Sequence, residues 1–166
     1  MTAERRQRKS ALLFGILLIV GVLGSIEAPG PLRAAPEHQL AVNPTTGLAI
    51  SGFDPVAYFV EGKALFGRPE IELNFDGAVW RFTNEGNRGA FALHPEVYGP
   101  RFGGYDPVAI GRDRSVAGHP LIWTIAGQRL YFFYSERNRA AFLLDPGHMI
   151  ETAERKWPRV SKTLER

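Results

Sequence analysis

Cysteine is the residue that this chain most clearly lacks, because none occurs among its 166 residues. Disulfide bridges, metal sites built on thiolates and cysteine nucleophiles all depend on that side chain, so the sequence excludes all three. It equally excludes a lipid anchor on an N-terminal cysteine. The cofactor is therefore unknown, except that no metal can be bound through a thiolate.

Motifs of several enzyme classes are also missing. The sequence contains no phosphate-binding loop, no dinucleotide-binding glycine pattern, no HExxH motif and no Ser–His–Asp order of a known hydrolase family. No two of its four histidines lie four residues apart, the spacing at which one face of a helix presents two metal ligands. We therefore expect a protein that is not an enzyme.

One extended hydrophobic run is present, ALLFGILLIVGVLG at residues 11–24. It is shorter than the about 20 residues of a membrane span, and it follows the basic stretch ERRQRK at residues 4–9. These features are typical of a secretory signal peptide, which we assign to residues 1–35, with a linker at residues 36–47. We expect an exported, periplasmic protein; the alternative is that residues 11–24 are not cleaved and anchor it in a membrane.

The excess of positive charge belongs to this N-terminal part. The whole chain carries 20 Lys and Arg residues against 17 Asp and Glu residues. Residues 1–35 hold five of the basic and two of the acidic side chains, which leaves 15 of each sign in residues 36–166. A neutral domain gives no electrostatic reason to expect nucleic acid as a partner, so the expected partner is a small ligand or another protein.

Internal repetition dominates the rest of the chain. GFDPVAY at residues 52–58 returns as GYDPVAI at residues 104–110, and NEGNRGAFALHP at residues 84–95 returns as SERNRAAFLLDP at residues 135–146. Between these segments, each copy has two aromatic and β-branched runs around a glycine turn, the pattern of a β-hairpin. We therefore divide the folded part, residues 48–166, into a first copy at about 48–98 and a second at about 102–149.

Each copy predicts the same series of elements. A turn and short strand at residues 56–60 and 108–110 precede the hairpin, and a helix capped by Asn84 or Ser135 follows it. An amphipathic segment at residues 149–157, ending at Pro158, predicts a terminal helix. The expected fold class is α+β: two tandem strand-hairpin-helix repeats packed as one pseudo-symmetric domain, plus a C-terminal helix, since one copy alone is too small to bury its sheet face.

The order of DPV, an aromatic hairpin strand and a helix of the pattern [SN]-E-x-x-R-x-A-F-x-x-x-P resembles the YHS domain, over residues 48–158. FGGYDPVA at residues 102–109 and KWP at residues 156–158 are similar to the exported, tandem YHS proteins. For that family, the resemblance implies heavy-metal binding through cysteines. The corresponding positions hold no thiol here: Ala57, Thr83 and Asn87 in the first copy, and Ala109, Tyr134 and Asn138 in the second. The thiolate chemistry of the family therefore does not carry over.

Asp54 and Asp106, one in each copy, are the first candidates for a ligand-binding site. Two carboxylates that meet between the copies could hold a hard metal ion or act as an acid–base pair. The alternative is a turn, in which Asp accepts backbone N–H bonds and Pro presets the backbone. His119 is the third candidate metal or ligand contact, because the first copy has Arg68 nearby and no histidine.

Three further residues are candidates for ligand contacts. Arg101 and Tyr105 flank a Gly-Gly pair, where the backbone could approach a ligand closely; the alternative is a flexible joint between the copies. Tyr134 occupies a position of a family cysteine and could line a pocket.

Taken together, these features favour an exported YHS-like protein of non-enzymatic function that binds a small ligand or a metal ion. The alternative is a structural or protein-interaction module with degenerate metal sites. A hydrolase or oxidoreductase that uses Asp54, Asp106 and His119 is a third hypothesis.

Overall fold

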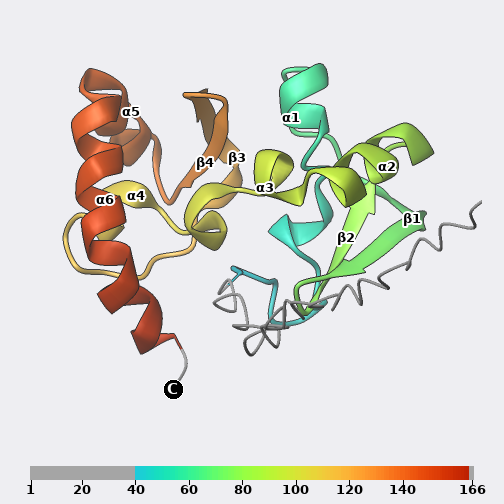
Figure 1. Cartoon of the computed structure of the whole chain (residues 1–166), viewed down its shortest axis with the longest axis horizontal. Helices are drawn as coiled ribbons and strands as arrows, with labels where there is room; N and C mark the ends of the chain where they lie inside the picture. Colours follow the sequence, from blue (N-terminus) through green and yellow to red (C-terminus); the bar gives the residue numbers. More distant parts are fainter. Residues whose placement is uncertain (1–39, 165–166) are drawn as a thin grey trace, which may run out of the picture. The chain divides into compact units, whose positions relative to one another are not determined.

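Two antiparallel β-hairpins, each followed by a helix, form the framework of the fold (Figure 1). The computed structural model describes residues 40–164, which belong to one compact unit. The expected signal segment and residues 36–39 of the expected linker lie outside the described residues. The α+β class predicted from the sequence is confirmed.

The elements follow one another in the same order in the two halves, which we define as residues 48–98 and residues 102–164. The strands are β1 (Arg68–Phe75), β2 (Ala78–Phe82), β3 (His119–Ala126) and β4 (Arg129–Phe133). The α-helices are α1 (Ala57–Val60), α2 (Glu85–Leu93), α3 (Pro95–Tyr98), α4 (Pro107–Ile110), α5 (Glu136–Leu144) and α6 (Pro146–Val160). Short 3-10 turns are η1 (Ile50–Gly52), η2 (Arg101–Gly104) and η3 (Ser161–Thr163).

Both hairpins form where the sequence predicts them. Their connecting residues, 76–77 and 127–128, have positive φ values between 51° and 73°. Two consecutive residues with positive φ form the tight turn whose twist matches that of the flanking strands. The pairing register shifts within the first strand of each hairpin, next to Pro69 and Pro120, because proline has no N–H to donate to the ladder.

The residues that follow each Asp-Pro pair form the short helices α1 and α4, so the strands predicted there were wrong. Asp106 Oδ1 accepts hydrogen bonds from the backbone N–H groups of Val108 and Ala109 at 2.8 and 3.2 Å, which makes Asp106 the N-cap of α4. Pro107 occupies the first helical position. Asp54 makes the corresponding bonds before α1. A capping carboxylate and a preset φ start a helix here, and they outweigh the strand preference of the valine that follows.

The terminal helix is longer at both ends than the predicted segment 149–157, since α6 begins at Pro146 and ends at Val160. Asp145 caps it by accepting a hydrogen bond from the His148 N–H at 3.0 Å. The helix continues through Pro158, whose missing N–H removes one hydrogen bond close to the C-terminal end. Among the helices of residues 40–164, none is long and apolar enough to cross a membrane.

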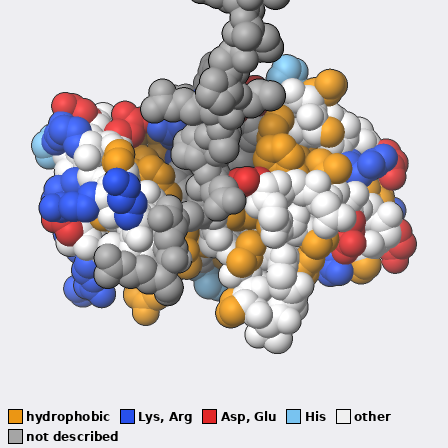
Figure 2. All heavy atoms as spheres, turned by 60° about the horizontal axis from the view of Figure 1, so that its bottom comes forward, with side chains coloured by type: hydrophobic (Ala, Val, Ile, Leu, Met, Phe, Trp, Pro, Cys, Tyr) orange, Lys and Arg blue, Asp and Glu red, His pale blue; other side chains and the backbone are white. Residues whose placement is uncertain are grey.

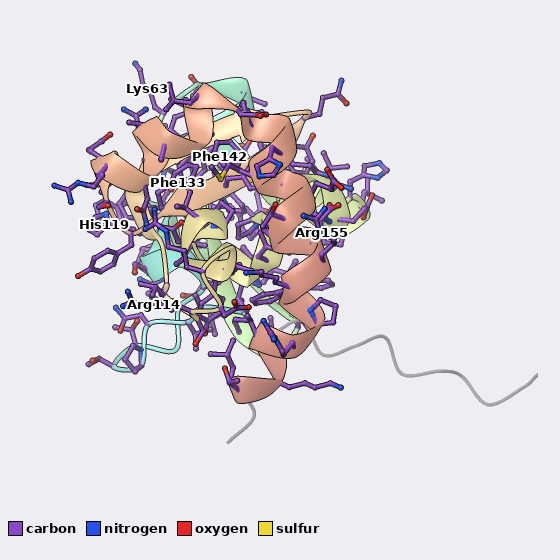
Figure 3. The ribbon with its side chains drawn as sticks, turned by 90° about the vertical axis from the view of Figure 1, so that its left-hand side faces the viewer. Lys63, Arg114, His119, Phe133, Phe142 and Arg155 are labelled. Carbon is purple, nitrogen blue, oxygen red and sulfur yellow. The ribbon has the colours of Figure 1, made fainter. Side chains whose placement is uncertain are left out.

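Strand β4 is buried on both faces, between two hydrophobic clusters. Because successive side chains of a strand point to opposite faces, Leu130 and Phe132 join a cluster made mostly of first-half residues. Tyr131 and Phe133 join the cluster of the second half, in which the rings of Phe133 and Phe142 lie with their centroids 5.1 Å apart (Figure 3). The core therefore consists of two clusters on either side of one strand.

Tyr58 of α1 connects the first half to the second hairpin. Its side chain is buried, and its hydroxyl donates a hydrogen bond to the Pro120 carbonyl oxygen at 3.0 Å. Its ring lies edge-on against the rings of Trp123 and Phe132, with centroids 5.0 and 5.4 Å away. Burial, and secondly the charge of Asp54, raise the pKa of Tyr58. The phenol therefore stays protonated and keeps its hydrogen bond.

Gly118 offers a direct test of how closely the second hairpin approaches the chain before it. A Cβ added at this position would lie 2.4 Å from Phe132 Cβ and 2.7 Å from its carbonyl carbon. We expect Gly118→Ala to lower the free energy of unfolding by about 3 kcal/mol, because rigid backbone must move. Gly89→Ala in α2 is the control: its Cβ would meet no atom within 4 Å, and it should stabilise by about 0.5–1 kcal/mol. Urea unfolding of the two variants measures both, and equal stability would contradict the packing.

Candidate functional site

Asp54 is fully buried and ties the start of α1 to the junction between β2 and α2. Its Oδ1 accepts from the N–H groups of Val56 and Ala57 at 2.9 and 3.3 Å. Its Oδ2 accepts from the Thr83 N–H at 2.8 Å, the Thr83 hydroxyl at 2.7 Å and the Asn87 amide Nδ2 at 2.7 Å. One carboxylate therefore holds together two segments about thirty residues apart in the chain.

Asp106 has the same role in the second half and is also fully buried. Besides capping α4 with Oδ1, it accepts with Oδ2 from the Tyr134 N–H at 2.9 Å and from Asn138 Nδ2 at 2.6 Å. Asn138 is in turn held by Ser135, whose hydroxyl accepts its backbone N–H at 3.3 Å. The strand-to-helix junction between β4 and α5 is thus fixed to the start of α4.

The two carboxylates have their hydrogen-bonding capacity filled. An ionised carboxylate offers about four lone-pair sites, while Asp54 receives five hydrogen bonds and Asp106 receives four. All of these donors belong to the same half as the carboxylate that they bond. Within residues 40–164, no group of three or more His, Asp or Glu side chains is arranged to hold a metal ion. The arrangement is that of two structural carboxylates.

The hydrogen bond of the His119 side chain involves neither Asp54 nor Asp106. It begins β3 on the surface, where its Nδ1 accepts the backbone N–H of Leu121 at 3.2 Å. Its partner in the hairpin ladder is Phe133, as the partner of Arg68 is Phe82, so Arg68 is its counterpart in the first half. In Figure 3, His119 points outward from the edge of the second half.

Arg101 and Tyr105 contact α6 on either side of the glycine pair. The Arg101 guanidinium pairs with Glu154 at 2.6 Å, and the Tyr105 ring lies 5.7 Å from that of Trp157. Burial raises the pKa of Tyr105. The segment between them is the 3-10 turn η2, in which Phe102 is buried although its φ is 54°. Its first-half counterpart, η1, has the same left-handed backbone, so the glycine pair belongs to a defined turn and is not simply a joint.

Tyr134 is 65% exposed and lines a surface pocket of the second half with a volume of about 390 Å³. We call this the arginine pocket; its lining includes Ala109, Arg112, Arg114, Tyr134, Arg137 and Asn138. It therefore includes Ala109, Tyr134 and Asn138, the three second-half residues that the sequence resemblance aligns with the cysteines expected of a YHS domain. Of the six candidate residues, Tyr134 is the one whose side chain the structure places in this pocket.

The three arginines of the pocket were missed in the sequence. Their signal is a difference between the copies: at the offsets of the repeat, Arg112, Arg114 and Arg137 correspond to Val60, Lys63 and Gly86. Corresponding residues of the two copies are 52 positions apart before this loop and 51 positions apart after it. A search for identical residues therefore passes over the loop, where few residues match. Comparing the charges of the two copies position by position would have found it.

Asp113, between two of these arginines, points toward α6. Its backbone has a φ of 60°, and its carboxylate pairs with Lys156 at 2.9 Å and with Arg159. Lys156 also donates to the Gly111 carbonyl oxygen at 2.7 Å. Hydrogen bonding to Lys156, followed by the hydrogen bond and charge of Arg159, holds the pKa of Asp113 below its usual value. We call this set of contacts the α6 clamp.

Comparison with known proteins adds no relative, since no family model, no curated protein and no solved structure matches the chain.

The buried carboxylates predict a large effect of a nearly isosteric change. Asp106→Asn replaces an oxygen that accepts N–H groups by an amide that also donates, so donors face donors. We expect the free energy of unfolding to fall by about 3 kcal/mol. Asp76→Asn, at an exposed hairpin turn where asparagine tolerates a positive φ, should change stability little. Chemical denaturation compares the pair, and an Asp106→Asn protein as stable as the parent would refute the structural role.

The α6 clamp predicts a pH-dependent docking of that helix. The pKa of Asp113 is lowered in the folded protein. The stability that its ionised carboxylate gives to the docking of α6 is therefore complete above the usual pKa, and it is lost as the pH falls through the lower folded pKa. We expect Asp113→Asn to weaken amide-exchange protection of α6 at pH 7, with the difference from the parent shrinking below about pH 4. Hydrogen exchange followed by mass spectrometry measures this. Identical protection of α6 in the two proteins at pH 7 would contradict the clamp.

Proposed function

We propose that this chain is a non-enzymatic binding protein that holds a small ligand in the arginine pocket. One observation carries the proposal: the pocket is lined by Ala109, Tyr134 and Asn138, the positions where the resembling YHS domains carry their metal-binding cysteines. Its volume of about 390 Å³ falls in the range of small-molecule pockets. The location of the family's site would thus be kept, and its ligand changed.

The same proposal treats the halves as tandem YHS-like copies packed as one pseudo-symmetric domain. Equivalent contacts support it beyond the sequence repeat itself. The Gly67 N–H donates to the Gly52 carbonyl, and the Gly118 N–H donates to the Gly104 carbonyl, both at 2.9 Å. The carboxylate networks of the two halves also correspond bond for bond, except for the extra hydroxyl donor of Thr83.

A small molecule fits this site better than a metal ion does. Asp106, which is hydrogen-bonded to the lining residues Ala109, Tyr134 and Asn138, is fully buried and already accepts four hydrogen bonds. Arginine, asparagine and alanine do not supply the anionic oxygen, imidazole or thiolate ligands that metal ions prefer. The pocket therefore offers charge and hydrogen-bond donors to a ligand.

A protein-interaction module is the second candidate function, and exposed apolar side chains favour it. They include Phe66, 69% exposed, and Leu144 at the end of α5, 88% exposed. Export to the periplasm, or attachment through residues 11–24, is part of either proposal and rests on the sequence pattern of residues 4–24.

Binding in the arginine pocket can be tested by a fragment screen on the isotope-labelled chain. We expect fragments to shift the amide signals of residues 109–116 and 134–138 together. Tyr134→Ala should lower the affinity for these fragments several-fold, because it removes exposed aromatic surface. Leu144→Ala removes an exposed apolar side chain elsewhere and is the control. Zn²⁺, Cu²⁺ and Fe²⁺, added alone, should leave these signals in place. Fragments that shift other residues only would contradict the proposal.

A further inference from the structure

We propose that the ligand of the arginine pocket carries a phosphate group, or an oxyanion of similar size and charge. This inference rests on the proposed function and names the class of its ligand. Arg112 and Arg114 come from the loop after α4, and Arg137 comes from the first turn of α5. Three guanidinium groups around one pocket match an anion with several oxygens, because each offers a planar pair of N–H donors.

The arginines of the pocket have no ion-pair partner among the residues that the structure describes. The acidic residues next to them in the chain are engaged elsewhere: Asp113 pairs with Lys156 and Arg159, and Glu136 pairs with Arg139 at 2.8 Å. Among the described residues the positive charge of the pocket is therefore not compensated by an ion pair, although residues 36–166 hold equal numbers of basic and acidic side chains.

The α6 clamp explains how two arginines can flank an aspartate without pairing with it. Asp113 is directed to α6 by a left-handed backbone and by two cations of that helix. Figure 3 shows Arg114 at the outer edge of the second half, away from Arg155 of α6. In Figure 2, Lys and Arg side chains gather on the side where Figure 1 has α5 and α6. The clamp thus removes the carboxylate between Arg112 and Arg114, which would otherwise compete with an anionic ligand.

The positive charge distinguishes the second half from the first. Of the three counterpart positions, Val60, Lys63 and Gly86, only one is basic. A charge needed for the fold would be expected in both copies, because each copy is held together internally by a corresponding carboxylate network. A charge present in one copy is what a ligand-binding role acquired after duplication would leave.

The pocket also has room and surface for an organic group. Tyr134 offers an exposed aromatic ring at its rim, and Val116 and Ala109 provide apolar surface. A phosphate monoester with an attached ring or chain would therefore bind more tightly than inorganic phosphate alone.

Titration calorimetry of the full chain with phenyl phosphate, inorganic phosphate and phenol tests this inference. We expect phenyl phosphate to bind with the highest affinity, inorganic phosphate with a lower affinity and phenol with the lowest. The affinity of the two charged probes should fall as the salt concentration is raised. Arg112→Gln, Arg114→Gln and Arg137→Gln should each weaken phenyl phosphate binding about tenfold, and the triple variant should abolish it. Arg155→Gln, which removes an exposed arginine paired with Glu151 on α6, is the matched control and should bind as the parent does.

Each contrary outcome has a distinct meaning. Undiminished phenyl phosphate binding by the triple variant would overturn the inference, as would binding to phosphatidylglycerol vesicles with none to the soluble monoester. Phenol binding in the pocket without any gain from phosphate would also overturn it, while leaving the proposed function in place. If neither charged nor neutral probes shift the amide signals of the pocket, both proposals fail. Thermal melts of every variant verify that a lost affinity is not a lost fold.

Discussion

The hydrogen-bonded carboxylate of an Asp-Pro pair is the constraint on which each half of this structure depends. Asp54 and Asp106 are buried and form no ion pair within residues 40–164, where the donors gathered around them offset the cost of removing a carboxylate from water. Those donors come from a helix start on one side and a strand-to-helix junction on the other. Each carboxylate therefore fixes the position of the short helix relative to the hairpin, and the Asp106 network also positions Ala109, Tyr134 and Asn138, which line the arginine pocket.

The two halves use the same network but play different parts in the core. Strand β2 has alternate residues buried, as expected for a strand with one face on the core, whereas β4 has four consecutive buried residues. Since Tyr58 of the first half packs against Phe132 of β4, the second hairpin serves both clusters. The two halves therefore cannot be related by exact symmetry, because only one hairpin can lie between the two hydrophobic clusters. The outer loop of the second half, which bears Arg112 and Arg114, lies outside this shared packing and is free to differ.

Much of this fold could be predicted from local sequence, and the failures have physical reasons. Glycine turns between aromatic runs specify the hairpins, and the caps Asn84 and Ser135 specify α2 and α5. The helices after Asp-Pro were predicted as strands because valine favours strands, and a capping bond is not visible in composition. The burial of Asp54 and Asp106 depends on Thr83, Asn87 and Asn138, which meet them only after folding. The arginine pocket likewise joins a loop and a helix that no local pattern connects.

The side chains of Ala109, Tyr134 and Asn138 support the proposal of a small ligand over that of a metal ion. Asn138 lines the pocket and donates its side-chain amide N–H to Asp106, so this carboxylate oxygen is already occupied by a hydrogen bond. Ala109 takes up little space in the pocket, and Tyr134 contributes an exposed ring. The aspartate between Arg112 and Arg114 pairs instead with Lys156 and Arg159 of α6. The positive charge of the pocket thus depends on a helix, α6, that has no counterpart of its length in the first half, where α3 ends after one turn.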